Sequence, residues 1–157
     1  MYRLSFLILL LVCFACKNDK SKIVKPIEIN FNKEAELTFL KEKDTLVNLD
    51  LELAESDYEQ QTGLMHRKSM KIKQGMLFIY KDERPRPTFY MKNTQIPLDL
   101  IYINADFKVV EINKNAKPFD ENPIGAKQPA QYVLEVNAGF VDQFNITDSL
   151  SVSFQKL

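Results

Sequence analysis

The strongest constraint on the fold of this chain is a run of alternating apolar and polar residues over 47–53. Val47, Leu49, Leu51 and Leu53 alternate there with Asn48, Asp50 and Glu52. Successive side chains of a β-strand point to opposite faces, so this pattern is typical of a strand with one buried face. A single strand cannot bury that face, and the chain therefore has to build a sheet around it.

Other segments also have the length and the apolar character of strands. They are residues 75–80, 89–92, 98–103, 107–112, 132–136 and 150–154. Asn104, Ala105 and Asp106 separate two of these segments and predict a hairpin turn. Prolines predict a loop or an edge strand over 81–87 and a long loop over 113–130.

Signals for helices are fewer. Ser56 and Glu59 form a capping-box pattern and Gly63 suits the end of a helix, so we expect a short helix between Ser56 and Gly63. A second short helix is expected over 138–144. Because strands outnumber helices and do not alternate with them, we predict a mainly β (α+β) fold, a small antiparallel barrel or sandwich with one or two short helices.

The N-terminus has the organisation of a signal peptide. One basic residue, Arg3, precedes an apolar run from Phe6 to Ala15, which is too short to cross a bilayer as a helix because about 20 residues are needed. The run ends at Cys16, which follows the small residue Ala15 and precedes a polar stretch. This arrangement resembles a bacterial lipoprotein signal, with Cys16 as the lipidated residue. An ordinary secretory signal with an incidental cysteine is the alternative.

The lipoprotein reading divides the chain into three parts. They are a signal peptide over 1–15, the lipidated cysteine with a flexible polar tether over 16–33, and a single globular β-rich domain over 34–157. No cysteine then remains for a disulfide, because Cys13 is removed and Cys16 is acylated. A mature chain of about 140 residues can be stable without one, since roughly two thirds of its surface is buried on folding.

Charge and motifs exclude several classes of function. Lys plus Arg and Asp plus Glu both total 21, so no basic surface for nucleic acid is expected. The glycines of the domain are isolated, which excludes a Gly-rich phosphate-binding loop. His66 is the only histidine and the mature domain has no free cysteine, so neither a His/Cys zinc site nor a histidine-assisted nucleophile is expected. We therefore predict no cofactor and no metal site.

Polar residues follow an apolar segment directly over 89–99. Lys92, Asn93, Thr94 and Asp99 stand among residues suited to a core. Such a change from strand to loop can direct polar groups into one pocket. The structural alternative is that Asn93 and Thr94 stabilise a turn, while Asp99 pairs with Lys92 or Arg67.

Four blocks of this sequence resemble the family called domain of unknown function 192. They are Gly63-Leu64-Met65-His66-Arg67, Gly75-Met76-Leu77-Phe78, Phe89 through Asp99, and Tyr132-Val133-Leu134-Glu135 with Ala138-Gly139. The resemblance covers roughly Leu46 to Phe154 and implies a similar strand-rich fold, without an established reaction. The chain departs from the family at Tyr90, where Trp is usual, which keeps an aromatic ring but alters any stacking surface.

The resemblance also implies a set of polar positions that could bind a ligand. They are Arg67, Lys92, Asn93, Thr94, Asp99 and Glu135. A buried charge without a partner costs several kcal/mol, so we expect Arg67 or Lys92 to pair with Asp99 or Glu135 if these side chains lie inside the fold.

Three hypotheses of function remain open. The first is a non-catalytic module that binds a small polar or sugar-like ligand or a protein partner through these residues. The second is a carboxylate-dependent hydrolase-type enzyme, with Asp99 or Glu135 as general base and Lys92 or Arg67 stabilising negative charge. The third is a Cu(I) site, because thioethers suit Cu(I) and Met65, Met76 and Met91 lie in the family blocks.

The lipid anchor would place the protein in the bacterial cell envelope, with the membrane as its first partner. Lys17 stands after Cys16, where an Asp would retain a lipoprotein at the inner membrane of enteric bacteria. We therefore expect delivery to the outer membrane, on its periplasmic or its surface face.

Overall fold

A computed structural model describes residues 29–86 and 88–157 of the chain. The predicted signal peptide, Cys16 and most of the predicted tether lie outside the described residues. The last residues of that tether contact the domain, because the amide of Asn32 donates to Oε1 of Glu52 at 2.9 Å and Lys33 pairs with Asp50 at 2.7 Å.

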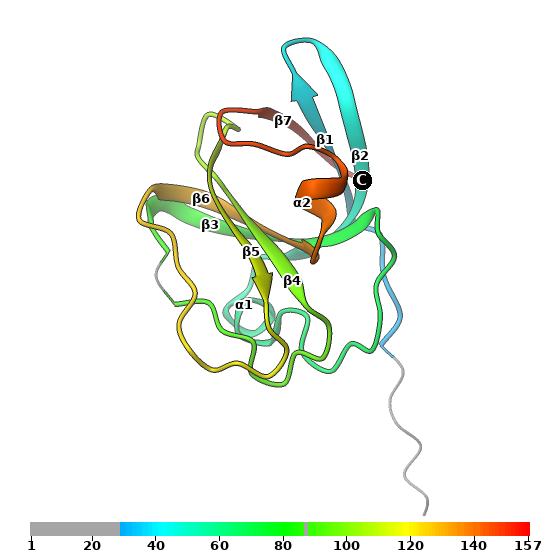
Figure 1. Ribbon diagram of the computed structural model, residues 1–157, viewed down its shortest axis with the longest axis vertical. Helices are drawn as coiled ribbons and strands as arrows, with labels where there is room; N and C mark the ends of the chain where they lie inside the picture. The colour runs from blue at the N-terminus through cyan, green and yellow to red at the C-terminus, as the bar shows by residue number, and fades with distance from the viewer. Residues whose placement is uncertain (1–28, 87) are drawn as a thin grey trace, which may run out of the picture.

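The described residues form one seven-stranded sheet and two short helices (Figure 1). The elements are β1 (Ala35–Lys41), β2 (Asp44–Ala54), α1 (Asp57–Thr62), β3 (Gln74–Pro85), β4 (Leu98–Ile103), β5 (Val109–Ala116), β6 (Pro129–Asn137), α2 (Phe140–Gln143) and β7 (Ser151–Lys156). The strand order is β5-β4-β6-β3-β2-β1-β7. All pairs of neighbours are antiparallel except β2 with β3, which run parallel.

The predicted mainly β fold with short helices is confirmed, and the sheet is not closed into a barrel. A single bridge between Lys108 and Ser151 brings the two ends of the sheet together at one corner, which explains the sandwich-like shape. The parallel pair arises because the segment after β2 contains α1 and crosses to the next strand instead of forming a hairpin.

Alternation along the strands divides the apolar core into two clusters, one on each face of the curved sheet. The first cluster includes Leu37, Phe39, Leu49, Leu51, Leu77, Ile101, Leu134 and Phe140. The second cluster includes Leu64, Met76, Phe78, Met91, Leu98, Leu100, Tyr102 and Val133. In Figure 1, α1 and the loops after it lie at the lower end of the domain, where they cover the second cluster.

Several sequence predictions need correction in their bounds. The strand predicted over 75–80 continues to Pro85, and residues 81–85 form an edge segment, as one of the two alternatives for 81–87 predicted, since β2 pairs with β3 only as far as Phe78. Residues 89–92 form a single bridge, Phe89 with Ile124, instead of a strand. The loop predicted over 113–130 is shorter, because β5 extends to Ala116 and β6 begins at Pro129. Strand β1 was not predicted, although Ala35, Leu37 and Phe39 alternate with Glu36 and Thr38 and point their side chains into the core.

Helix α1 forms for the local reason that the sequence suggests. The side chain of Ser56 accepts from the amide of Glu59 at 3.3 Å, and the carboxylate of Glu59 accepts from the amide of Ser56 at 2.8 Å. Gln60 then ties the helix to the sheet, because its Nε2 donates to the carbonyl oxygens of Ala54 at 3.3 Å and Ile79 at 2.9 Å. The helix is therefore held against the ends of β2 and β3.

Gly75 lies where β3 and β6 come too close for a side chain. A Cβ at this position would lie 2.8 Å from the carbonyl oxygen of Glu135 and 3.1 Å from Cγ1 of Val136. We expect Gly75→Ala to lower the free energy of unfolding by about 3 kcal/mol, because the backbone has to shift. The matched variant Gly139→Ala has open space but a φ of 88°, so it should cost about 1 kcal/mol from backbone strain alone. Urea denaturation of both variants checks this, and a smaller loss at Gly75 than at Gly139 would contradict it.

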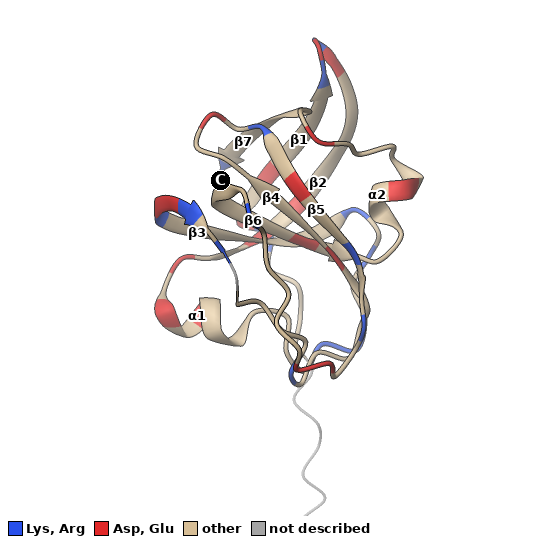
Figure 2. Ribbon diagram, turned by 60° about the vertical axis from the view of Figure 1, so that its left-hand side comes forward, with Lys and Arg blue, Asp and Glu red and all other residues tan. Residues whose placement is uncertain are grey.

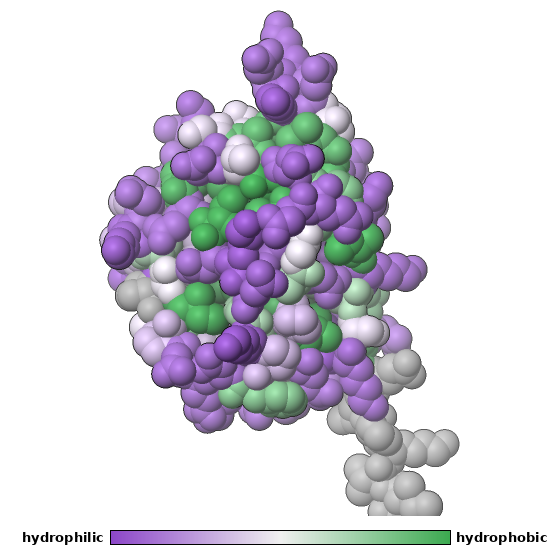
Figure 3. Space-filling model, viewed as in Figure 1, coloured by the Kyte–Doolittle hydropathy of each residue, from purple (hydrophilic) through white to green (hydrophobic). Residues whose placement is uncertain are grey.

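Hydrophilic side chains cover most of the face in Figure 3, including the β1–β2 hairpin that protrudes at its top. Acidic and basic residues are interspersed along the described chain (Figure 2). Neither described helix is long and apolar enough to cross a membrane.

Candidate functional site

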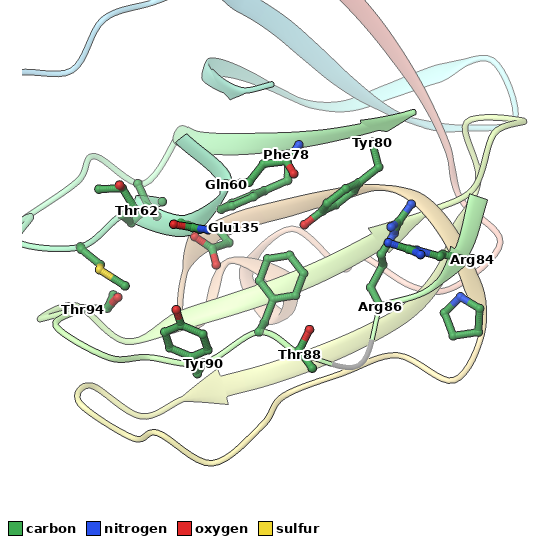
Figure 4. Close-up of a pocket in the computed structure, with 16 residues that line it drawn as sticks. Gln60, Thr62, Phe78, Tyr80, Arg84, Arg86, Thr88, Tyr90, Thr94 and Glu135 are labelled. Carbon is green, nitrogen blue, oxygen red and sulfur yellow. The ribbon is translucent and has the colours of Figure 1, made fainter. Parts of the chain in front are cut away.

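A cavity of about 390 Å³ lies at the end of the domain that carries α1 (Figure 4). Its lining comes from α1 and the segment after it, from β3 and the loop after β3, and from Glu135 of β6. The lining residues are Gln60, Gln61, Thr62, Gly63, Leu64, Met65, Phe78, Tyr80, Arg84, Pro85, Arg86, Thr88, Phe89, Tyr90, Thr94 and Glu135. The volume lies within the range of about 300 to 1,000 Å³ that small-molecule sites occupy.

Glu135 places a carboxyl group in the middle of this cavity (Figure 4). Its neighbours in β6, Leu134 and Val136, point into the first cluster, so alternation turns Glu135 toward the second cluster and the cavity. The side chain is only 6% exposed and makes no hydrogen bond or ion pair with the residues that the structure describes. Burial raises the pKa of Glu135 to about 8, so the carboxyl is mostly protonated at pH 7.

Aromatic rings form the walls around this carboxyl. The rings of Phe78 and Phe89 meet edge to face with their centroids 5.2 Å apart. The hydroxyl groups of Tyr80 and Tyr90 point toward the interior of the cavity in Figure 4. Tyr90 is 42% exposed, so its ring stands at the mouth of the cavity. Burial raises the pKa of Tyr80 to about 12, which keeps its hydroxyl neutral as a donor.

Two arginines mark one end of the cavity. The guanidinium of Arg86 is buried and stacks on the ring of Tyr80 at 3.8 Å from the ring centroid. Its Nε donates to the carbonyl oxygen of Ala130 at 3.0 Å, and its Nη2 donates to Asp82 Oδ1 at 3.1 Å. Arg84 is exposed, and its Nε lies 3.4 Å from Asp82 Oδ2.

The structure brings two of the six predicted ligand-binding residues, Thr94 and Glu135, to the cavity. Lys92 and Asn93 are exposed outside its lining, in a turn where Asn93 has a φ of 57° and the amide of Thr94 donates to the carbonyl of Met91 at 3.0 Å. This agrees with the structural alternative for Asn93, because asparagine tolerates positive φ better than most residues.

Arg67 and Asp99 are both buried and do not line the cavity, and the predicted pairing of Arg67 with Asp99 or Glu135 is wrong. Arg67 forms its ion pair with Glu52, inside the domain. Asp99 accepts three backbone N–H groups instead of a cation. Its Oδ1 accepts from Asn115 at 3.0 Å, and its Oδ2 accepts from Gly139 at 3.0 Å and Val141 at 3.1 Å. The carboxylate of Asp99 therefore ties β5 and the start of α2 to β4.

Strand register separates Asp99 from Glu135. In the β4–β6 pair, Asp99 lies opposite Val136 and Leu100 lies opposite Glu135. Residues that lie opposite each other share a face, so Asp99 faces the first cluster and Glu135 faces the second. The two acids thus cannot act on one ligand.

Comparison with known proteins supports the resemblance seen in the sequence. Residues 38–154 match the sequence profile of DUF192, a family described as an uncharacterized ACR. The chain belongs to the DUF192 family. No curated protein matches it.

Two solved structures are similar to this DUF192 chain. A "putative transcription regulator" from Sinorhizobium meliloti 1021 is 34% identical, with a TM-score of 0.73 over 81% of this chain and 97% of that one. A protein of unknown function from Novosphingobium aromaticivorans DSM 12444 is also 34% identical, with a TM-score of 0.68 over 75% of this chain and 83% of that one.

Three residues that line the cavity of this DUF192 chain were not predicted as site residues, namely Tyr80, Arg84 and Arg86. Arg84 and Arg86 lie in the Pro-containing segment that was predicted only as a loop or an edge. The apolar alternation that places Phe78 on the second cluster also places Tyr80 there, and this signal could have identified it. Glu135 carried the clearest signal, an acid within an otherwise apolar strand.

The three methionines of the Cu(I) hypothesis divide between the core and the cavity. Met76 and Met91 are buried in the second cluster, while Met65 lines the cavity. Filling of an apolar core accounts for Met76 and Met91. Within residues 29–86 and 88–157, no group of three or more His, Cys, Asp or Glu side chains could hold a metal ion.

Proposed function

We propose that this protein is a non-catalytic binding domain on a lipid-anchored protein of the bacterial cell envelope, and that its cavity binds a small polar, sugar-like ligand. The observation that carries the proposal is Glu135, a buried carboxyl group without a partner among the described residues, in the centre of an aromatic cavity. A polar group that is buried without a partner is costly, so a ligand that supplies hydrogen bonds would be stabilised there.

The lining suits a ligand with apolar faces and many hydroxyl groups. Phe78, Phe89 and Tyr90 offer ring surfaces for the C–H faces of a sugar-like molecule. Thr62, Thr94 and Gln61 offer hydroxyl and amide groups. The protonated Glu135 both donates and accepts, which matches a hydroxyl group better than a carboxylate would.

A carboxylate-dependent enzyme is the second candidate, and the pKa of Glu135 favours it. A carboxyl group with a pKa of about 8 is protonated at neutral pH, as a general acid has to be. Glycoside hydrolysis usually needs two carboxyl groups, and Glu135 is the one carboxyl group among the residues that line the cavity. We therefore favour binding over hydrolysis. Release of a product from a bound glycan, lost in Glu135→Gln, would reverse this order.

The ligand-binding proposal is tested with a pair of tyrosine variants. Tyr90→Ala removes a ring at the mouth of the cavity, and we expect binding to glycans on an array to weaken about fivefold, since an aromatic contact contributes about 1 kcal/mol. Tyr58→Ala is the control, because Tyr58 is 76% exposed on α1 and outside the lining. Equal binding by both variants, or no glycan bound by the wild type, would contradict the proposal.

Anchoring in the envelope is supported by the N-terminal sequence alone. Cells that express the full chain should incorporate labelled palmitate into it, and Cys16→Ala should abolish the label. Fractionation of the labelled cells should place the protein in the outer membrane, because Lys17 follows Cys16. An unlabelled wild-type chain would exclude the lipid anchor.

A further inference from the structure

The charged groups that line the cavity do not balance one another. Arg84 and Arg86 each carry a positive charge, and Glu135 is the one lining residue with an acidic side chain. Because burial raises the pKa of Glu135 to about 8, that carboxyl offsets little of the positive charge at pH 7. The lining is thus cationic, although the chain as a whole has equal numbers of basic and acidic residues.

Most of the Arg86 guanidinium is engaged in contacts within the domain. Its Nε and Nη2 donate to Ala130 and Asp82, and its plane lies over the ring of Tyr80. The side chain is 5% exposed. Arg86 therefore holds Tyr80 in place and contributes a fixed positive charge to this end of the cavity.

Arg84 differs from Arg86 because most of its donors are available. The side chain is 67% exposed, and its one contact with an acid among the described residues is Nε to Asp82 Oδ2 at 3.4 Å, longer than an ordinary charge-assisted hydrogen bond. Asp82 is shared with Arg86, whose hydrogen bond holds the pKa of the Asp82 carboxyl below its usual value. Two guanidinium groups thus share one carboxylate.

We infer that the ligand is an acidic sugar, whose single carboxylate or phosphate binds to Arg84 at the arginine end of the cavity while its ring lies toward Tyr90. Guanidinium groups match the geometry of both anions with two parallel hydrogen bonds. The fixed charge of Arg86 adds attraction without needing a direct contact. This inference rests on the proposed function, because it concerns the ligand of the same cavity.

The test uses the full-length chain, purified in detergent, on an array that holds each glycan in a neutral form, a carboxylate form and a phosphate form. We expect the wild type to prefer the acidic forms, and the carboxylate and phosphate forms distinguish the two anions. Arg84→Gln should weaken binding of the acidic forms about tenfold or more and leave the neutral forms unchanged. Arg84 does not hold the core, so the variant should fold normally.

Lys43→Gln is the control for a general loss of positive charge. Lys43 is exposed in the β1–β2 turn, at the opposite end of the domain from the cavity (Figure 1). This variant should bind all forms like the wild type. Equal binding of neutral and acidic forms, unchanged in Arg84→Gln but weakened in Tyr90→Ala, would overturn the acidic ligand and leave the proposed function intact. No binding of any glycan would overturn both.

Discussion

At pH 7 we expect Glu135→Gln to raise the free energy of unfolding by about 3 kcal/mol. The pKa of Glu135 is about 8 in the fold, against an ordinary value of 4.5 that applies to the unfolded chain. Between these values the folded protein binds a proton that the unfolded chain has released, so the stability of the wild type falls as the pH rises. A pH of 7 lies about 2.5 units above the pKa of the unfolded chain, so protonating Glu135 on folding costs the wild type about 3 kcal/mol of stability. Glutamine has a similar shape but does not titrate, so folding of the variant takes up no proton at this position.

The diagnostic feature is the pH dependence of this difference. Urea denaturation should show that the free energy of unfolding of Glu135→Gln exceeds that of the wild type by little near pH 4.5. The difference should grow through neutral pH and level off above pH 8. The charged and titratable groups around Glu135 are Tyr80, Arg84 and Arg86 from β3, Tyr102 from β4 and Tyr90 from the loop. Burial raises the pKa values of Tyr80 and Tyr102, so neither hydroxyl ionises in this range. A difference that stays constant from pH 4.5 to 8 would contradict the buried, protonated carboxyl.

Asp99→Ala should lower the free energy of unfolding by about 3–5 kcal/mol. The substitution leaves three backbone N–H groups, those of Asn115, Gly139 and Val141, without an acceptor in the interior. Asp99→Asn keeps one acceptor oxygen and should lose less stability than Asp99→Ala. It therefore provides a folded variant if the alanine variant does not fold. Urea denaturation measures both.

Asp106→Ala is the matched control for Asp99, because Asp106 is exposed in the β4–β5 turn. It should change the stability by less than about 0.5 kcal/mol. Folded Asp99→Asn should also bind glycans like the wild type, since Asp99 does not line the cavity. Weaker glycan binding in a stable Asp99→Asn variant would mean that Asp99 acts on the ligand after all.

Local patterns in the sequence predicted the elements well where neighbours along the chain decide the structure. The capping box of Ser56 and Glu59 and the alternation of β2 depend on residues within a few positions of one another, and both are confirmed. The site was harder to predict. Glu135 and Thr94 reach the cavity, whereas Lys92 and Asn93 stand outside it because the turn directs them to solvent.

The sequence also could not predict which residues pair with the buried charged side chains. Arg67 has acids on several strands within reach of a folded chain, and the sequence carries no signal that selects Glu52. Arg84 and Arg86 lie in a segment whose prolines indicate only that it is not a central strand. The packing of α1 against β3, through Gln60, is what converts this segment into the wall of a cavity.

By itself, the sequence determined the β-rich fold, its short helices, the membership in the DUF192 family and the presence of an acid within an apolar strand. Only the tertiary structure decided which acid faces the cavity. A shift of one residue in the β4–β6 register would place Asp99 opposite Glu135 or Asn137, and both acids would then lie on the same face of the sheet, because side chains alternate along a strand. Register depends on contacts between residues far apart in the chain, which no local pattern contains.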